Sequence, residues 1–71
     1  MWTHGTPTRI TRQRDLVRLT RMELAALVRV SRQTIWAIER ERSIPSVTLA
    51  IAIARALETT VEELFGADDL R

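Results

Sequence analysis

The chain has 71 residues, with eleven arginines, nine acidic residues and a formal net charge of +2. A chain of this length forms one small domain that buries only about 60% of the surface its unfolded form exposes, so a deep cleft between domains is not expected. The sequence has no cysteine, which excludes disulfides and thiolate metal sites. Its one histidine, His4, is too few for a metal cluster. We therefore expect no metal, no cofactor and no small-molecule substrate.

The sequence predicts neither a membrane span nor a signal peptide. Its longest stretch without charge, residues 43–54, is interrupted by Pro45 and is far shorter than the roughly 20 apolar residues that a spanning helix needs. No charged head followed by an apolar region opens the chain. These features predict a cytoplasmic protein.

Positive charge is concentrated in the first part of the chain. Residues 1–45 hold nine arginines and four acidic residues, a net charge of +5, whereas residues 46–71 hold two arginines and five acidic residues, a net charge of −3. One part of the molecule can therefore face a polyanion, and the other cannot.

The chain divides into an arm, a helical domain and a tail. Residues 1–8 mix Gly, Pro and Thr without periodicity and are predicted to be a flexible arm. Residues 9–66 show five short helical patterns and no strand pattern, which predicts an all-α domain. Residues 67–71 are predicted to be a short acidic tail.

The first three helical patterns cover roughly residues 9–39. The first extends over about residues 9–17, on the spacing of Ile10, Gln13, Leu16 and Val17. In the second, a Thr-x-x-Glu capping box precedes an apolar stripe, and the residues concerned are Thr20, Glu23, Leu24, Leu27 and Val28. A third helix begins after the cap Ser31 and buries Ile35 and Ile38, which leaves it a broad polar front.

Two further helices follow a loop that contains Arg42, Ser43 and Pro45. Ser46 is a cap for a helix that extends to Leu57. Its predicted core face consists of Val47, Ala50, Ile53, Ala54 and Leu57. A second capping box, Thr60 and Glu63, opens a short helix over residues 61–65, which Gly66 ends.

The segment from Arg21 to Glu39 has the spacing of a helix-turn-helix. With Arg21 as position one, a small residue, Ala25, stands at position five, where two helices cross at close range. Apolar residues at positions ten, fifteen and eighteen, Val30, Ile35 and Ile38, hold the second helix against the first. The ordinary alternative is a helical hairpin that binds nothing, and the agreement of six spaced positions, which also include Leu24 and Val28, argues against it.

These residues resemble the Xre family, the phage repressor and Cro type of helix-turn-helix regulator. Three stretches carry most of the resemblance: VSRQTIWAIER (30–40), PSVTLAIAIARAL (45–57) and TTVEELF (59–65). The resemblance implies a compact five-helix repressor-like DNA-binding domain. It also implies a homodimer that binds a palindromic operator in double-stranded DNA.

The resemblance assigns roles to individual residues. The helix Arg32–Glu39 is expected to read the major groove, with base edges contacted by Arg32, Gln33, Trp36 and Ala37. The DNA backbone is expected to be contacted by Arg21, Ser31, Thr34, Arg40, Arg42 and Ser43. A structural ion pair is expected between Arg14 and Glu39. From helical angles, Ile51, with Phe65 and Leu70, is a candidate dimer contact.

Several of these assignments have alternatives. Arg32 and Gln33 are otherwise a solvated polar face, and Trp36 can pack against Trp2 of the arm or against a dimer partner instead of DNA. The other arginines are often only solubilising charges, and the Arg14–Glu39 pair can be an ordinary surface salt bridge worth less than about 1 kcal/mol.

The sequence departs from the family at three arginines. The family usually has glycine at the turn position held by Arg29, and often at the position held by Arg18. A left-handed backbone there costs a residue with a β-carbon roughly 1 kcal/mol or more, so the turn is either strained or different in geometry. Arg21 replaces a glutamine that the family favours, which exchanges a neutral phosphate contact for a charged one.

The function expected from these features is sequence-specific transcription regulation, as a repressor or an activator. The alternative is an antitoxin-like or assembly module whose helix-turn-helix also binds a partner protein. Against it, only eight residues precede the predicted domain and about five follow it, too few to wrap a partner. An enzyme is not expected, because the folded part has no histidine, cysteine or lysine and its paired carboxylates are predicted to be solvated.

Overall fold

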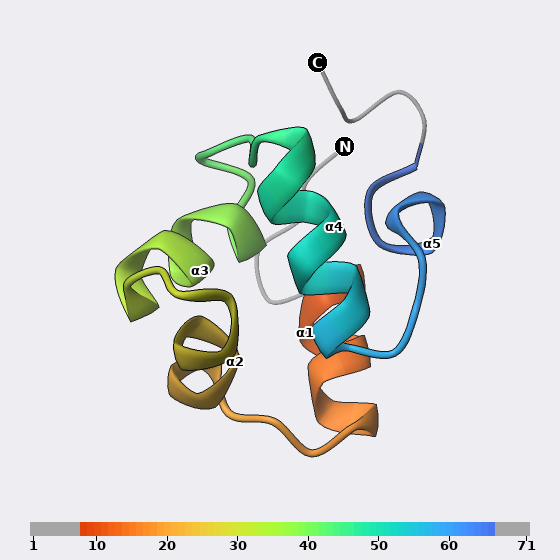
Figure 1. Ribbon diagram of the computed structural model, residues 1–71, viewed down its shortest axis with the longest axis horizontal. Coiled ribbons are helices and arrows are strands. Elements are labelled where there is room, and N and C mark those ends of the chain that lie inside the picture. Colours follow the sequence, from red (N-terminus) through yellow and green to blue (C-terminus); the bar gives the residue numbers. More distant parts are fainter. Residues whose placement is uncertain (1–7, 67–71) are drawn as a thin grey trace.

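The computed structural model describes residues 8–66 and contains five helices in that range (Figure 1). They are α1 (Arg9–Leu16), α2 (Arg21–Val28), α3 (Arg32–Glu39), α4 (Val47–Ala56) and α5 (Val61–Phe65). The described part of the chain is all-α, as the sequence predicts. The predicted arm and tail lie outside the described residues, except for Thr8.

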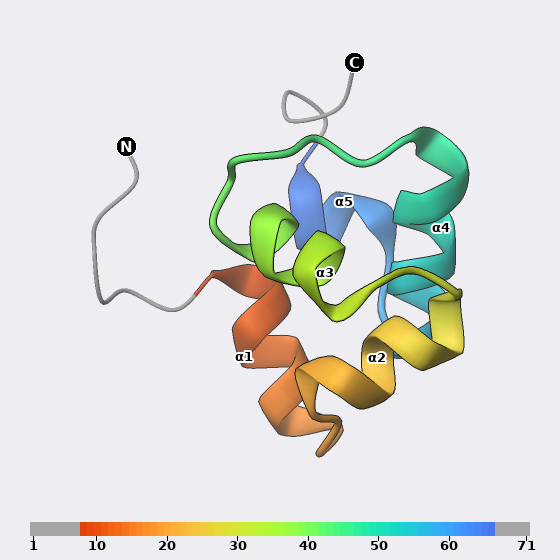
Figure 2. The same cartoon turned by 90° about the vertical axis from the view of Figure 1, so that its left-hand side faces the viewer.

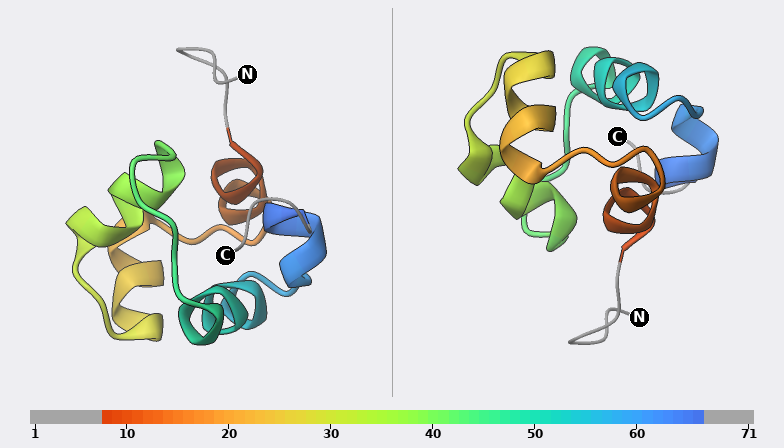
Figure 3. Two further views of the ribbon diagram at one scale, coloured as in Figure 1. Left: turned by 90° about the horizontal axis from the view of Figure 1, so that it is seen from above. Right: turned by 90° about the horizontal axis from the view of Figure 1, so that it is seen from below.

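The helices pack around one small core. α2 packs against both α3 and α4, and α5 packs against α1 and α4. In Figures 1 and 3, α2 and α3 lie on one side of the molecule and α5 on the opposite side. The residues with no measurable exposure in the core are Leu24, Ala50, Ile53 and Leu57.

A hydroxyl side chain caps the start of every described helix. In each case the cap oxygen accepts a hydrogen bond from the backbone N–H three residues later, which satisfies one of the donors that a helix N-terminus leaves open. The caps are Thr8, Thr20, Ser31, Ser46 and Thr60. Four of these are the predicted ones. The fifth, Thr8, is the last residue of the predicted arm and is the cap of α1.

The two predicted capping boxes differ. At α2, the Thr20 hydroxyl accepts from the Glu23 N–H at 3.0 Å, and the Thr20 N–H donates to Glu23 Oε1 at 2.8 Å. At α5, the Thr60 hydroxyl accepts from the Glu63 N–H, and only this half of the box forms. The motif therefore located both helix starts, but one box is incomplete.

Three apolar residues of the predicted helical patterns, among them the expected core residue Val47, are exposed. Leu16 is 74% exposed, Leu27 61% and Val47 53%. At about 100° per residue, Leu16 lies about 120° around α1 from the buried Ile10, and Leu27 lies about 60° from Leu24 on the side away from Ala25. Val47 has the correct angle, but it is the first residue of α4, one turn before Ala50.

Each of the four longer helices is followed, within two residues of its end, by a residue other than glycine whose backbone is left-handed. Arg18, Arg29, Glu41 and Glu58 have φ between 58° and 62°. The N–H of the residue after each one donates to a carbonyl five residues back, as in Val30 to Ala25 at 3.0 Å, which is the long bond of a Schellman motif. The turn after α2 therefore has the left-handed geometry that glycine adopts most easily, and it carries the strain of a β-carbon at Arg29.

Replacing Arg29 with glycine should relieve this strain. We expect Arg29→Gly to stabilise the domain by about 1 kcal/mol, which raises the melting temperature by about 4–8 °C for a domain of this size. Arg29→Ala is the matched control, since it removes the side chain but keeps the β-carbon. Thermal unfolding followed by circular dichroism compares the two, and equal melting temperatures for the glycine and alanine variants would contradict the account.

The complete capping box predicts a dependence of stability on pH. The hydrogen bond from the Thr20 backbone N–H, and then that from its side chain, lower the pKa of Glu23 below 4.5. Because the folded pKa is depressed, this contribution is present above pH 4.5 and is lost as the pH falls through the folded value. The stability advantage of the wild type over Glu23→Gln should therefore shrink between pH 6 and pH 3.

Chemical denaturation at several pH values measures this difference. Glu62→Gln is the control, because Glu62 is an exposed first-turn residue of α5 that belongs to no complete box. A wild-type advantage over Glu23→Gln that stays constant with pH would show that the carboxylate charge plays no part.

Candidate nucleic-acid interface

α3 separates an apolar back from a polar front. Ile35 and Ile38 are buried, at 1% and 5% exposure, and fix the rotation of the helix against the core. Arg32 and Gln33 are exposed on the first turn. The predicted division of this helix into a narrow buried stripe and a broad outward face is therefore present.

The front of α3 and the start of α2 border an open hollow. It has a volume of about 470 Å³ and is lined by Arg21, Arg32, Gln33 and Trp36. The last three are among the four predicted base readers, and Arg21 is one of the predicted phosphate contacts. The fold thus brings together residues from two helices that the sequence places eleven or more positions apart.

Trp36 is half-buried and lies beside two arginines. The guanidinium carbon of Arg40 is 5.0 Å from the centroid of the Trp36 ring, and that of Arg42 is 5.4 Å from it. Both distances suit a cation–π contact. The ring therefore packs against its own loop and helix end, while Trp2, the alternative partner in the arm, lies outside the described residues.

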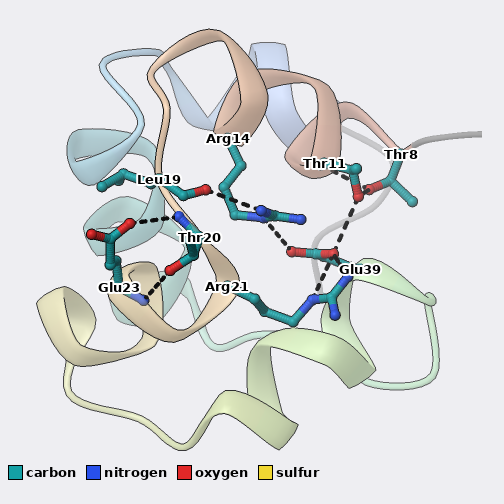
Figure 4. Close-up of polar contacts among 8 residues, drawn as sticks. All are labelled: Thr8, Thr11, Arg14, Leu19, Thr20, Arg21, Glu23 and Glu39. Carbon is teal, nitrogen blue, oxygen red and sulfur yellow. Dashed lines mark hydrogen bonds and ion pairs between the residues drawn. The ribbon is translucent and has the colours of Figure 1, made fainter.

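A buried carboxylate lies at the end of α3. Glu39 is 3% exposed, and Figure 4 shows donors from α1 and α2 converging on it. Arg14 Nε lies 3.0 Å from Oε2, and Thr11 Oγ1 lies 3.2 Å from Oε1. Arg21 donates to Oε1 through Nε at 3.2 Å and Nη2 at 3.0 Å. Arg14 also donates to the backbone oxygen of Leu19 at 3.0 Å.

This cluster contains more than the expected pair. Arg14 and Glu39 do form an ion pair, and their side chains are only 11% and 4% exposed, unlike those of a surface salt bridge. Neither Arg21 nor Thr11 was expected at Glu39. Arg21, which is expected to contact a phosphate, also pairs with Glu39, and its side chain remains 38% exposed.

The remaining predicted contacts are distributed around this face. Ser31 and Thr34 share a hydrogen bond at the start of α3, with 2.9 Å between their hydroxyl oxygens. Ser43 is exposed in the loop before α4, and Ala37 is half-buried behind the front of α3.

The candidate dimer contact is only partly available. Ile51 is 40% exposed on α4. Phe65 is 7% exposed and packs in the core, so little of its side chain is available for a contact between subunits. Leu70 lies outside the described residues.

Within residues 8–66, no helix is long and apolar enough to cross a membrane. The same part of the chain contains no group of three or more His, Cys, Asp or Glu side chains placed to hold a metal ion.

Removal of Arg14 should be costly because Glu39 is buried. We expect Arg14→Met to destabilise the domain by about 3 kcal/mol, the low end for breaking a buried pair, since Arg21 still neutralises the carboxylate. Arg12→Met, at an exposed position of the same helix, is the control and should change stability by less than about 0.5 kcal/mol. Urea denaturation measures both, and similar small losses would mean that the pair contributes no more than a surface salt bridge.

Several known proteins are similar to this chain in sequence. A helix-turn-helix family model matches residues 10–64. An uncharacterised HTH-type transcriptional regulator of Methanothermobacter thermautotrophicus is 46% identical over 63 residues, covering 87% of this chain and 91% of that protein. Proteins of the same description from Methanocaldococcus jannaschii (43% over 56 residues, 79% and 85%) and Archaeoglobus fulgidus (42% over 62 residues, 87% and 89%) are also similar. The chain belongs to the Xre-type helix-turn-helix family.

Proposed function

We propose that this protein is a transcriptional regulator that binds specific double-stranded DNA and reads the major groove with α3. The observation that carries the proposal is the hollow in which Arg21, Arg32, Gln33 and Trp36 meet. Side chains from α2 and α3 line it. In Figure 2 these two helices face the viewer, and α5, which carries Glu62 and Glu63, lies behind them. A polyanion can approach this side without meeting the acids of α5.

The front of α3 has the chemistry of base readout. A guanidinium such as that of Arg32 can donate to O6 and N7 of guanine, and the amide of Gln33 can bond N6 and N7 of adenine. Trp36 offers an apolar ring to a thymine methyl group or a sugar, and Ala37 is small enough to let the helix approach the groove floor. We assign base contacts to these four residues.

The rim of this front supplies contacts to phosphates. Arg40 and Arg42 lie over the Trp36 ring, and a guanidinium in such a contact keeps N–H groups for a phosphate. The hydroxyl groups of Ser31 and Thr34 at the start of α3, and that of Ser43 in the loop next to Arg42, are further donors. These residues, with Arg21, form the proposed backbone clamp.

A dimer follows from the size of the reading surface. One helix of eight residues spans only a few base pairs, and a two-fold pair of such helices reads a palindrome with half-sites about one DNA turn apart. The exposed Ile51 on α4 is the proposed contact between subunits. Such a dimer would repress transcription by occupying a promoter.

A second candidate function is favoured by the exposed apolar residues of α2. Met22 and Leu27 are 62% and 61% exposed. Apolar side chains of this size at a surface also suit a partner protein, as in an antitoxin-like or assembly module. In that case, binding to a partner would persist in variants whose DNA contacts have been removed.

Selection from a random duplex library, followed by fluorescence anisotropy at fixed salt, tests the main proposal. The selected duplex should bind at least about 1,000-fold more tightly than random DNA. Equal affinity for selected and random duplexes would contradict sequence-specific binding and leave the partner-binding function.

Substitutions on α3 should separate base readout from general charge. Arg32→Ala and Gln33→Ala should each weaken binding to the selected site by about tenfold or more, with a smaller effect on random DNA. Arg55→Ala removes an exposed arginine of α4 and should leave affinity within about twofold, since Arg55 is on another helix and does not line the hollow. A larger loss from Arg55→Ala than from Arg32→Ala would move the interface to α4.

A further inference from the structure

We propose that Glu39 is a positioning residue for DNA binding: it holds Arg21 so that the free edge of its guanidinium serves the hollow as a bidentate phosphate ligand. This inference rests on the proposed function and specifies how one site of it is built. It concerns the contact between α3 and α2, separately from the Arg14–Glu39 pair.

The hydrogen bonds of Arg21 divide its guanidinium into two edges. Nε and Nη2 both donate to the same oxygen, Oε1 of Glu39, at 3.2 and 3.0 Å. The group has five N–H donors in a fixed plane. Among residues 8–66, the opposite edge, made of Nη1 and the second Nη2 proton, donates to no protein acceptor. That edge is a two-pronged fork of the kind that matches two phosphate oxygens.

The place of Arg21 makes this edge accessible. Its side chain is 38% exposed, whereas that of Glu39 is 4% exposed. Arg21 lines the hollow together with Arg32, Gln33 and Trp36, so its neighbours there are donors and an aromatic ring, with no carboxylate among them. A phosphate that enters meets two guanidinium groups.

The charge balance around Glu39 favours an anion. Its single negative charge faces the two positive charges of Arg14 and Arg21, so the cluster keeps one positive charge. Arg14 is the more buried partner and also bonds the Leu19 carbonyl, which commits it to the protein interior. The surplus charge is therefore presented by Arg21.

Positioning has a physical benefit for binding. A free arginine on a surface loses conformational entropy when it binds phosphate, because rotation about several side-chain bonds is restricted, and this loss opposes the contact. The hydrogen bonds to Glu39 fix Arg21 in the unbound protein, so much of this entropy is already lost when the protein folds, before DNA binds. Lysine cannot replace it, because one ammonium lacks a second edge for the phosphate.

A double-mutant cycle on DNA affinity tests the proposal. The four proteins are the wild type, Glu39→Gln, Arg21→Ala and the double variant, each titrated with the selected duplex. Glu39→Gln should weaken binding about tenfold when Arg21 is present and by less than about twofold in the Arg21→Ala background. The effect of Glu39→Gln on Arg14 is common to both backgrounds and cancels. Equal losses in both backgrounds, or no loss in either, would overturn the proposal.

Arg21→Lys is a second variant that keeps the proposal testable if Glu39→Gln does not fold. It keeps the charge at a partly exposed position but loses the fork. We expect it to bind about tenfold more weakly, with the salt dependence of the affinity close to that of the wild type, whereas Arg21→Ala should reduce the salt slope by about one. An Arg21→Lys protein that binds as tightly as the wild type would overturn the proposal.

The failure of this inference is distinguishable from the failure of the proposed function. A wild-type protein that binds no duplex overturns both. A wild-type protein that prefers its selected duplex, with no coupling between Glu39 and Arg21, overturns the positioning role alone.

Discussion

The arrangement of the first three helices depends on one buried carboxylate, that of Glu39. A charged group with 3% exposure is costly unless it is paired and hydrogen-bonded. Here it accepts from Thr11 and Arg14 of α1 and from Arg21 of α2, so the end of α3 is bonded to both preceding helices. Ile35 and Ile38 fix the rotation of α3 about its axis, but they contact the core along only one turn, so the bonds of Glu39 are what hold the end of the helix in place.

That constraint explains how so small a domain can present a stiff polar surface. The front of α3 contributes little to the core, so packing alone leaves its end free to fray. Glu39 fixes the end of the helix from inside, Ser31 fixes its start by capping the Thr34 N–H at 3.0 Å, and Arg40 and Arg42 pack on Trp36 from the loop side. The residues between these points are free to meet a ligand without first becoming ordered.

The local features of the fold could be predicted from the sequence. Hydroxyl caps act within three residues, so Thr20, Ser31, Ser46 and Thr60 were found from their position before each apolar pattern. Leu16, Leu27 and Val47 belong to the predicted apolar patterns but are exposed, and the reason is not local. Helical spacing shows which residues share a face, but the neighbouring helices determine how wide the buried face is and how far along the helix it extends.

Individual residues of the candidate site could be predicted from the sequence, but the contacts between residues of different helices could not all be predicted. Helical spacing placed Arg32, Gln33 and Trp36 outside the buried stripe of α3, and the family resemblance supplied both their expected role and the pairing of Arg14 with Glu39. Nothing local indicates that Arg21 shares this carboxylate, since the two residues are eighteen positions apart and meet only through packing. The contact of Trp36 with Arg40 has a local signal, because residues four apart lie on one helix face.

The central claim is that the ordered front of α3 and the start of α2 form the DNA-binding surface. Backbone amide chemical shifts of the isotopically labelled protein, recorded during titration with the selected duplex, test this claim directly. The account predicts that the largest changes occur at Arg21, at residues 31–37 and at residues 40–43, with little change at residues 61–65. Changes concentrated on α4 and α5, with α3 unaffected, would contradict it.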